Sequence, residues 1–173
     1  MNKLDIKIAN IANITRVSHD YAMLKYRNPR PGYNKKVNML TIDRHGNIES
    51  KECILYLYDR TPLNIIKRHE LQNGDILIPK RLSNALPIYI DDASIYKVNN
   101  TLLNIVPPYF FIVRCNENYN SYFIYLNILN YMLCNRKQHS FWKLDDIKNI
   151  TIKDIPKEEQ DDFIQNYKNI FNN

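Results

Sequence analysis

The sequence predicts an α+β domain (mixed α/β), with a buried core helix and a C-terminal helix among short strands. Three observations support this fold class. The chain has 173 residues, which suits one domain or one domain with a short appendage. Its residues are 45% hydrophobic and include only three glycines, which is typical of a packed core. Short apolar runs and helical patterns alternate too irregularly for a repeated βαβ order.

The first third of the chain predicts an exposed loop among short strands. Residues 4–12 have an apolar spacing that fits either a strand or a short helix. Residues 25–36 contain two prolines and a glycine, so regular structure is not expected there. Residues 37–42 and 54–58 are typical of strands, and Gly46 favours a turn between them.

The middle of the chain predicts a short helix and a buried strand. Thr61 before Pro62 is a helix start, with Thr61 as N-cap, and the helix is expected to run to about Arg68. The turn signal Asn73–Gly74 precedes an apolar strand over residues 76–78, which Pro79 ends.

Three further strands are expected before the second helix. Residues 87–90 and 95–98 are short candidates. Residues 109–113 are continuously apolar, which indicates a strand buried on both faces.

The last third predicts two longer helices. Ser121 is expected to cap a helix over residues 122–134, whose apolar side chains go nearly all the way round, as in a core helix. A last strand is expected around residues 150–155, and Pro156 opens a final helix with acidic side chains in its first two turns. We therefore expect a domain over residues 1–155 and a C-terminal helix over 156–173. One apolar stripe runs along this helix: Phe163, Ile164, Tyr167, Ile170 and Phe171.

Composition narrows the class of protein. The formal net charge is +6, which permits nucleic-acid binding without requiring it. Cys53, Cys115 and Cys134 are far apart and odd in number, so free thiols in a reducing cytosol are expected rather than disulfides or zinc. The N-terminus lacks the apolar core of a signal peptide, and no apolar run approaches the ~18 residues of a membrane span. A soluble, cytoplasmic protein is expected.

The loop at residues 25–36 carries the most informative charge pattern, because no acid interrupts its cations. Cations neutralise phosphates, and an arginine or an asparagine on the same loop can contact a base. The candidate DNA-binding residues of this loop are Lys25, Arg27, Arg30, Tyr33, Asn34, Lys35 and Lys36, with Asn28 as a second amide. The alternative interpretation is a solvated basic loop.

Two smaller basic sites are expected to converge with this loop. Lys80 and Arg81 follow a strand end, and Arg136 and Lys137 follow the core helix. Acidic residues crowd the C-terminal part instead, so a basic, DNA-facing end and an acidic end are expected.

Catalytic signatures are weak, and neither an enzyme activity nor a cofactor is expected. The histidines lack metal-ligand spacing, and no nucleophile-elbow, phosphate-loop or dinucleotide motif occurs. A nuclease would need two carboxylates and a lysine to hold a metal ion against a phosphodiester, and Asp75, Asp146 and Lys148 are the one set available.

Several segments together resemble the specificity subunits of type I restriction–modification systems. Residues 71–78 match the stretch L-x-x-G-D-I-L-I, and residues 144–156, with Gln160, are similar to the closing pattern L-x-x-I-x-I-P-x-x-x-Q. The remaining matches lie in the family's order: residues 38–42 and 46–48 upstream, then Phe111–Arg114 and Ser121–Asn127 downstream. The resemblance covers roughly residues 4–165.

The resemblance implies a single target-recognition domain with a curved, mostly antiparallel sheet that docks loops into the DNA major groove. It also implies a partner methyltransferase subunit that performs the chemistry, and a restriction/translocase subunit that can join later. The recognition loops vary in this family, so no base-contacting residue carries over. The expected function is therefore a DNA sequence-recognition module that directs its partners to a target.

The sequence departs from the family pattern after Pro156. A full specificity subunit has two recognition domains and two long spacer helices, whereas this chain has one domain and a short helix. A half-subunit that dimerises, or docks a partner, through Phe163, Tyr167 and Ile170 would explain this, and so would a fragment. A regulator that competes with a full specificity subunit is the third interpretation.

Overall fold

The computed structural model describes residues 4–17, 25–43, 47–49, 52–80, 86–98, 101–135 and 141–171. Residues 170 and 171 are described by their backbone alone. The strands are β1 (Asp5–Lys7), β2 (Ala12–Arg16), β3 (Lys25–Tyr26), β4 (Lys35–Met39), β5 (Thr41–Ile42), β6 (Ile48–Glu49), β7 (Ile54–Leu57), β8 (Ile76–Pro79), β9 (Ile88–Tyr89), β10 (Asn104–Ile105), β11 (Phe110–Cys115) and β12 (Thr151–Lys153). The helices are α1 (Ile8–Ile11), α2 (Leu63–Arg68), the 3₁₀ helix η2 (Ala93–Tyr96), α3 (Ser121–Asn135), α4 (Leu144–Lys148) and α5 (Lys157–Phe171). None of these described helices is long and apolar enough to cross a membrane.

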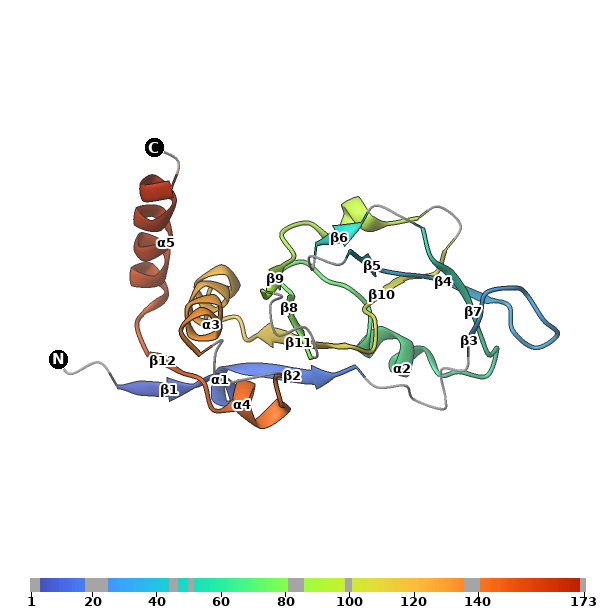
Figure 1. The fold of residues 1–173 in the computed structure, drawn as a ribbon, viewed down its shortest axis with the longest axis horizontal. Helices are drawn as coiled ribbons and strands as arrows, with labels where there is room; N and C mark the ends of the chain where they lie inside the picture. The colour runs from blue at the N-terminus through green and yellow to red at the C-terminus, as the bar shows by residue number, and fades with distance from the viewer. Residues whose placement is uncertain are drawn as a thin grey trace.

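A central sheet with strand order β2-β11-β8-β9 is antiparallel throughout (Figure 1). Its strands β8 and β11 are buried on both faces because side chains alternate between two apolar cores. Ile78 and Phe111 belong to the core beneath α3, whereas Leu77 and Ile112 belong to the core on the opposite face. The prediction of a doubly buried strand over residues 109–113 is confirmed for residues 110–113, whereas Tyr109 lies outside β11 and is exposed.

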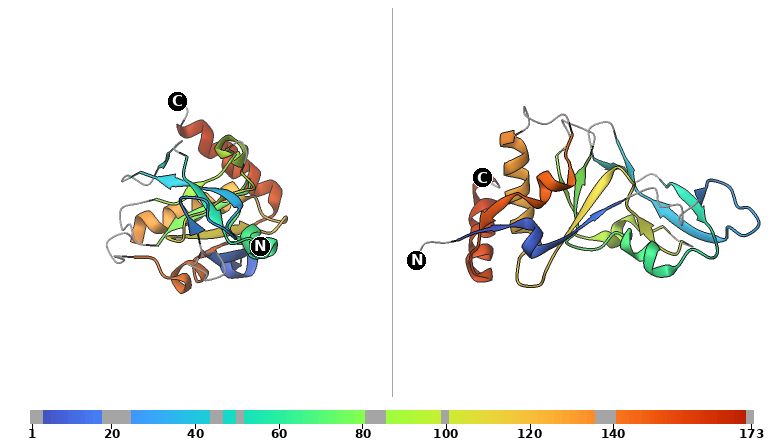
Figure 2. Two further views of the ribbon diagram at one scale, coloured as in Figure 1. Left: turned by 90° about the vertical axis from the view of Figure 1, so that its right-hand side faces the viewer. Right: turned by 90° about the horizontal axis from the view of Figure 1, so that it is seen from below.

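A second sheet, the distal sheet, has strand order β10-β4-β7-β3 and lies at the far end of the molecule from α5 (Figures 1 and 2). The β10–β4 pair is parallel and the other pairs are antiparallel. One face of this sheet packs Val37, Leu55 and Leu57 against Ile66 of α2. This small core positions β3 and β4 at the distal end.

The other end of the molecule is built from α3, α5 and the β1–β12 pair. The core helix α3 buries Phe123, Ile124 and Ile128, as its all-round apolar pattern predicts. The helix α5 starts directly after Pro156, and its Ile164 is buried in the core beneath α3. The α+β fold class is therefore confirmed, although the described strands divide among several sheets instead of forming one.

Two predicted helix caps are wrong by one residue. The N-cap of α2 is Pro62 in an extended conformation, and Thr61 lies one residue earlier, buried. The amide hydrogen of Tyr122 is bound by the Asn120 side-chain oxygen at 2.9 Å, so Asn120 rather than Ser121 caps α3. In both helices the predicted cap is a polar residue next to the true cap. The local sequence does not show which of the two neighbouring residues begins the helix.

Other boundaries also differ from those predicted. The predicted strand over residues 95–98 is wrong, because the Asp92 carboxylate accepts a hydrogen bond from the Ser94 amide and starts the 3₁₀ helix η2 there. The predicted strand over 37–42 is divided at Leu40 into β4 and β5. The ambiguous segment 4–12 holds both alternatives, a strand and one helical turn.

Candidate nucleic-acid interface

The basic segment over residues 25–36 is a loop between β3 and β4 at the distal end of the molecule (Figure 1). The prediction that this segment lacks regular structure is wrong at its two ends, which belong to β3 and β4. We call residues 27–34 the apical loop. Both flanking strands pair antiparallel with β7, one on each side of it. Lys25 and Lys35 therefore lie opposite Leu57, and Tyr26 and Lys36 lie opposite Tyr56. Directly opposed residues share a face of the sheet, so these two pairs point to opposite faces.

A tight turn shapes the middle of the apical loop. The Tyr33 amide donates a hydrogen bond to the Arg30 carbonyl at 2.9 Å, and Gly32 has a φ of 81°. Pro31 precedes this glycine, which is the residue pattern of a type II turn. The proline and glycine that predict a loop thus also define its conformation.

Asp59, in the turn after β7, holds the apical loop from the side. Its carboxylate accepts hydrogen bonds from the Asn34 amide at 2.6 Å and from the Asn34 side-chain Nδ2 at 2.8 Å. Its own amide donates to the Gly32 carbonyl at 2.8 Å. We call this arrangement of Asp59, Asn34 and Gly32 the clasp.

Aromatic rings support the apical loop from beneath. The ring centroids of Tyr26 and Tyr33 lie 4.8 Å apart at an edge-to-face angle, and those of Tyr33 and Tyr58 lie 5.3 Å apart. The Arg30 guanidinium lies 4.1 Å from the centroid of the Tyr26 ring, a cation–π contact made by an exposed side chain. Tyr33 is therefore part of the support of the loop.

Two of the predicted cations turn toward the inner face of the distal sheet. The Lys35 ammonium donates to the Thr61 carbonyl at 2.6 Å. The Lys25 side chain is half-buried beside the Met39 sulfur, and desolvation by this burial lowers the pKa of its ammonium group. Neither ammonium group projects from the apical loop.

The outward side chains of this region are fewer than the sequence predicts. Arg27, Asn28 and Arg30 are exposed, and none of the described residues forms a hydrogen bond or ion pair with the side chain of Arg27 or Asn28. Lys36 is half-buried on the face of Tyr56. Arg60, which the sequence interpretation missed, is exposed in the turn that carries Asp59. Its position directly after the strand over residues 54–58 is the signal that points to it.

The two smaller basic sites contribute less to the described surface. The Lys80 ammonium donates to the carbonyls of Val17 and Pro108, the latter at 2.6 Å, and lies 5.1 Å from the Phe111 ring centroid. These contacts join the ends of three strands, so Lys80 stabilises the fold. Arg81, Arg136 and Lys137 lie outside the described residues, and their convergence with the apical loop stays a prediction.

The residues of the nuclease alternative have structural partners. Asp75 is buried, and its Oδ1 lies 2.7 Å from Nε of Arg114. Asp146 accepts a hydrogen bond from the Lys143 amide at the start of α4. Within the described ranges, no three histidine, cysteine or acidic side chains gather to hold a metal ion.

The Asp75–Arg114 ion pair joins two of the segments that carry the family resemblance. Asp75 belongs to the stretch L-x-x-G-D-I-L-I and directly precedes β8, and Arg114 lies on β11. The Arg114 guanidinium also donates to the carbonyl of Glu70, and the Gln72 amide donates to Asp75 at 2.9 Å. The two segments are therefore joined in this structure, since one supplies a buried acid and the other its cation.

The stripe along α5 packs mainly within its own chain. Ile164 is buried and Tyr167 is half-buried against the same core. Phe163 is 46% exposed, and its ring meets the Phe123 ring edge to face at a centroid distance of 5.5 Å. The side chain of Ile170 lies outside the described residues. Phe163 is thus the described residue of this stripe that offers apolar surface to a partner.

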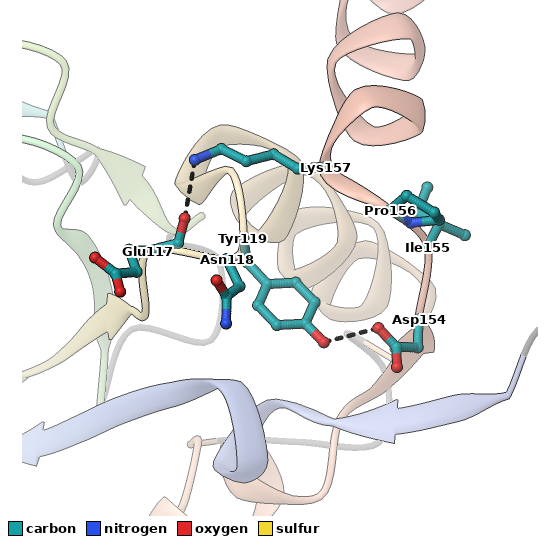
Figure 3. A pocket seen from close by; sticks show the side chains of 7 residues that line it. All are labelled: Glu117, Asn118, Tyr119, Asp154, Ile155, Pro156 and Lys157. Carbon is teal, nitrogen blue, oxygen red and sulfur yellow. Dashed lines mark hydrogen bonds between the residues drawn. The ribbon is translucent and has the colours of Figure 1, made fainter.

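An open pocket at the junction of α5 with the domain is lined by residues that form internal hydrogen bonds (Figure 3). The Lys157 ammonium donates to the Glu117 carbonyl at 2.8 Å, and the Tyr119 hydroxyl donates to Asp154 at 2.7 Å. Desolvation and this bond to Asp154 raise the pKa of Tyr119 to about 12, which keeps the donor protonated. These polar groups satisfy one another and tie α5 to the loop before α3.

Solved structures with the same architecture show which fold this is. No protein-family profile and no curated protein matches the chain. The crystal structure of the HsdS subunit from Thermoanaerobacter tengcongensis superposes on 98% of this chain with a TM-score of 0.62 and 12% sequence identity. The chain has the fold of part of an HsdS subunit.

A second structure gives the same result. It belongs to work on the complex assembly and conformational transition of the type I R-M system, and it covers 98% of the chain with a TM-score of 0.58 and 15% identity. The chain spans 37% and 38% of the lengths of these two chains. The fold that the sequence resemblance implies is therefore confirmed.

Proposed function

We propose that this chain is the DNA sequence-recognition module of a type I-like restriction–modification system. The observation that carries the proposal is the apical loop, which exposes Arg27 and Arg30 on an ordered turn at one end of an HsdS-like fold. Guanidinium groups bind phosphates, and also guanine in the major groove. Sequence reading requires such groups on a rigid support, because base contacts depend on orientation.

The distribution of charge supports this orientation on DNA. Acidic side chains occupy the exposed surface of α5, at the opposite end of the molecule from the apical loop (Figure 1): Glu158, Glu159, Asp161 and Asp162. Phosphates repel this end and attract the other. A duplex would therefore lie across the distal sheet, with α5 directed away from it.

The chemistry would belong to partner proteins. A methyltransferase subunit, and in larger assemblies a restriction/translocase subunit, would act on the DNA that this module locates, in the cytoplasm. The end of the molecule that carries α5 would dock the partner or a second copy, with Phe163 as the described apolar contact. A homodimer would read a symmetric, bipartite site.

Salt-dependent binding to duplex DNA tests the proposal. Each phosphate contact contributes roughly −0.9 to the slope of log K against log salt. The double variant Arg27→Ala/Arg30→Ala is expected to lower the magnitude of that slope by about two and to weaken binding. The slope is measured by fluorescence anisotropy of a labelled duplex across a salt series.

A matched variant separates local contacts from net charge. Lys7→Ala/Lys153→Ala removes the same charge from the exposed β1–β12 pair, near α5. Its slope is expected to stay close to that of the wild type. Equal slopes for the two double variants would show that the apical loop does not contact phosphate.

A further inference from the structure

We infer that Asp59 is a positioning residue for DNA recognition, which acts through Asn34 and the apical loop, and that Asn34 itself contacts no base. This inference rests on the proposed function and names the groups that carry its specificity. The clasp would hold one loop conformation, in which Asn28 meets a base edge while Arg27 and Arg30 contact phosphates. Two observations support it: the hydrogen bonds that Asp59 makes to the loop, and the exposure of the Asn28 side chain. The negative charge of Asp59 makes the inference testable.

The clasp connects the tip of the loop to the frame of the distal sheet. Asp59 follows β7 in a turn in which the Thr61 amide donates to the Tyr58 carbonyl at 2.9 Å. From that turn Asp59 makes three hydrogen bonds, two to Asn34 and one to the Gly32 carbonyl. Hydrogen bonds to a carboxylate are stronger than neutral ones, so the loop is held on the side that faces β7.

The same contacts decide which amide can read a base. An asparagine that recognises adenine uses its side-chain nitrogen and oxygen together. The Asn34 nitrogen already donates to Asp59, whereas Asn28 is exposed beside Arg27. The geometry therefore assigns amide recognition to Asn28 and leaves Asn34 to support the loop.

The charge of Asp59 makes the inference testable by the direction of an effect. A carboxylate near DNA repels phosphate, so its removal should tighten binding if only charge matters. If Asp59 positions the loop, its removal should weaken sequence-specific binding, because a mobile loop pays more ordering entropy and loses orientation. The two mechanisms predict opposite changes in the specific affinity of Asp59→Ala.

The first experiment compares the DNA motifs that variants of the full chain select from a library of randomised duplexes. Asp59→Ala is expected to lose about tenfold in its preference for the selected motif over random duplex, with an unchanged salt slope. Asp59→Asn, which retains an acceptor for the Asn34 amide, should restore part of that preference. The control Glu52→Gln removes an exposed acid from the loop at the other end of β7 and should keep the full motif.

A double-mutant cycle distinguishes support from direct contact. If Asn34 acts only through Asp59, Asn34→Ala weakens the preference, and the double variant with Asp59→Ala is no worse than Asp59→Ala alone. Asn28→Ala should instead relax the motif at a single base pair. Additive losses, or a single relaxed base pair in Asn34→Ala, would overturn the inference.

Proteolysis tests the clasp without DNA. Trypsin can cleave after Arg27 but not between Arg30 and Pro31, so cleavage between Arg27 and Asn28 reports opening of the loop. Asp59→Ala is expected to be cleaved there about tenfold faster than the wild type, while fluorescence of the buried Trp142 shows an unchanged core. Equal cleavage rates would overturn the clasp.

The possible failures are distinct. A wild-type chain that binds no duplex overturns the proposed function, and with it the role of the clasp in recognition, whatever the proteolysis shows. A wild type that binds, together with an Asp59→Ala variant that keeps its motif or binds it more tightly, overturns the inference alone.

Discussion

Gly74 shows how a single residue joins a turn to the core helix. Its φ is 79°, and a Cβ at this position would lie 3.0 Å from the Ser121 Oγ. We expect Gly74→Ala to reduce the free energy of unfolding by about 2 kcal/mol or more, because the left-handed conformation alone costs a non-glycine residue roughly 1–2 kcal/mol. Urea unfolding monitored by Trp142 fluorescence measures this change.

The substitution Gly32→Ala is a control that measures the free-energy cost of a positive φ without a steric clash. Gly32 has a φ of 81°, but a Cβ there would lie 3.6 Å from the Tyr58 ring, which is an ordinary contact. Gly32→Ala should therefore cost only the conformational part, roughly 1–2 kcal/mol. A Gly74→Ala variant no less stable than Gly32→Ala would show that Ser121 can move aside.

At the scale of elements, Gln160 attaches α5 to the domain. Its side chain is buried, its Oε1 accepts from the Asn120 amide at 2.8 Å, and its Nε2 donates to the Ile155 carbonyl at 2.8 Å. We expect Gln160→Ala to lower the free energy of unfolding by about 1–3 kcal/mol, because it leaves buried backbone groups without partners. Hydrogen exchange should show the loss of protection concentrated in α5.

Gln165 is the matched control on the same helix, because it is exposed. Gln165→Ala should change stability by less than about 0.5 kcal/mol. Equal effects of the two substitutions would mean that the apolar packing of Ile164 alone holds α5. The resemblance to L-x-x-I-x-I-P-x-x-x-Q includes Gln160, and the hydrogen bonds supply the physical reason for a glutamine at that place.

The elements that could be predicted are those whose patterns are local. The buried strand over residues 109–113, the turn at Gly74 and the helix after Pro156 all follow from short-range spacing, and all are confirmed, the strand from Phe110 onward. The 3₁₀ helix at residues 93–96 was not predicted, because residues 95–98 were interpreted as a strand, whereas the Asp92 carboxylate caps a helical turn there. The helix α4 was not predicted either, since five residues carry too little periodicity.

At the scale of the whole molecule, the Asp75–Arg114 ion pair joins the central strands of the fold. Burial raises the pKa of the Asp75 carboxyl, and the hydrogen bonds from Arg114 oppose that rise. We expect Arg114→Met to destabilise the protein by about 3 kcal/mol near neutral pH, because it leaves a buried carboxylate without its cation. Urea unfolding of the variant and the wild type measures the difference.

The pH dependence of the same variant gives an independent check. Without Arg114, the pKa of Asp75 rises further in the folded state, so the folded protein binds this proton more tightly than the unfolded chain does. Stability then falls as pH rises through the folded pKa, and the deficit of Arg114→Met should be smaller at about pH 5 than at about pH 8. A deficit that does not change with pH would mean that Asp75 does not titrate in this range.

The amino-acid order alone sufficed for the fold class, the position of the basic loop and the family resemblance, because each rests on spacing within a few residues or on the order of short segments. Tertiary structure was needed to sort the cations of that loop. Lys25 and Lys35 alternate with their neighbours along β3 and β4, and pairing with β7 turns both toward the inner face. Asn34 meets its acceptor Asp59 twenty-five residues later, and Lys80 meets carbonyls of two distant strand ends. Such partners are brought together by sheet pairing, so the spacing of charges along the chain does not reveal which of them remain available to a ligand.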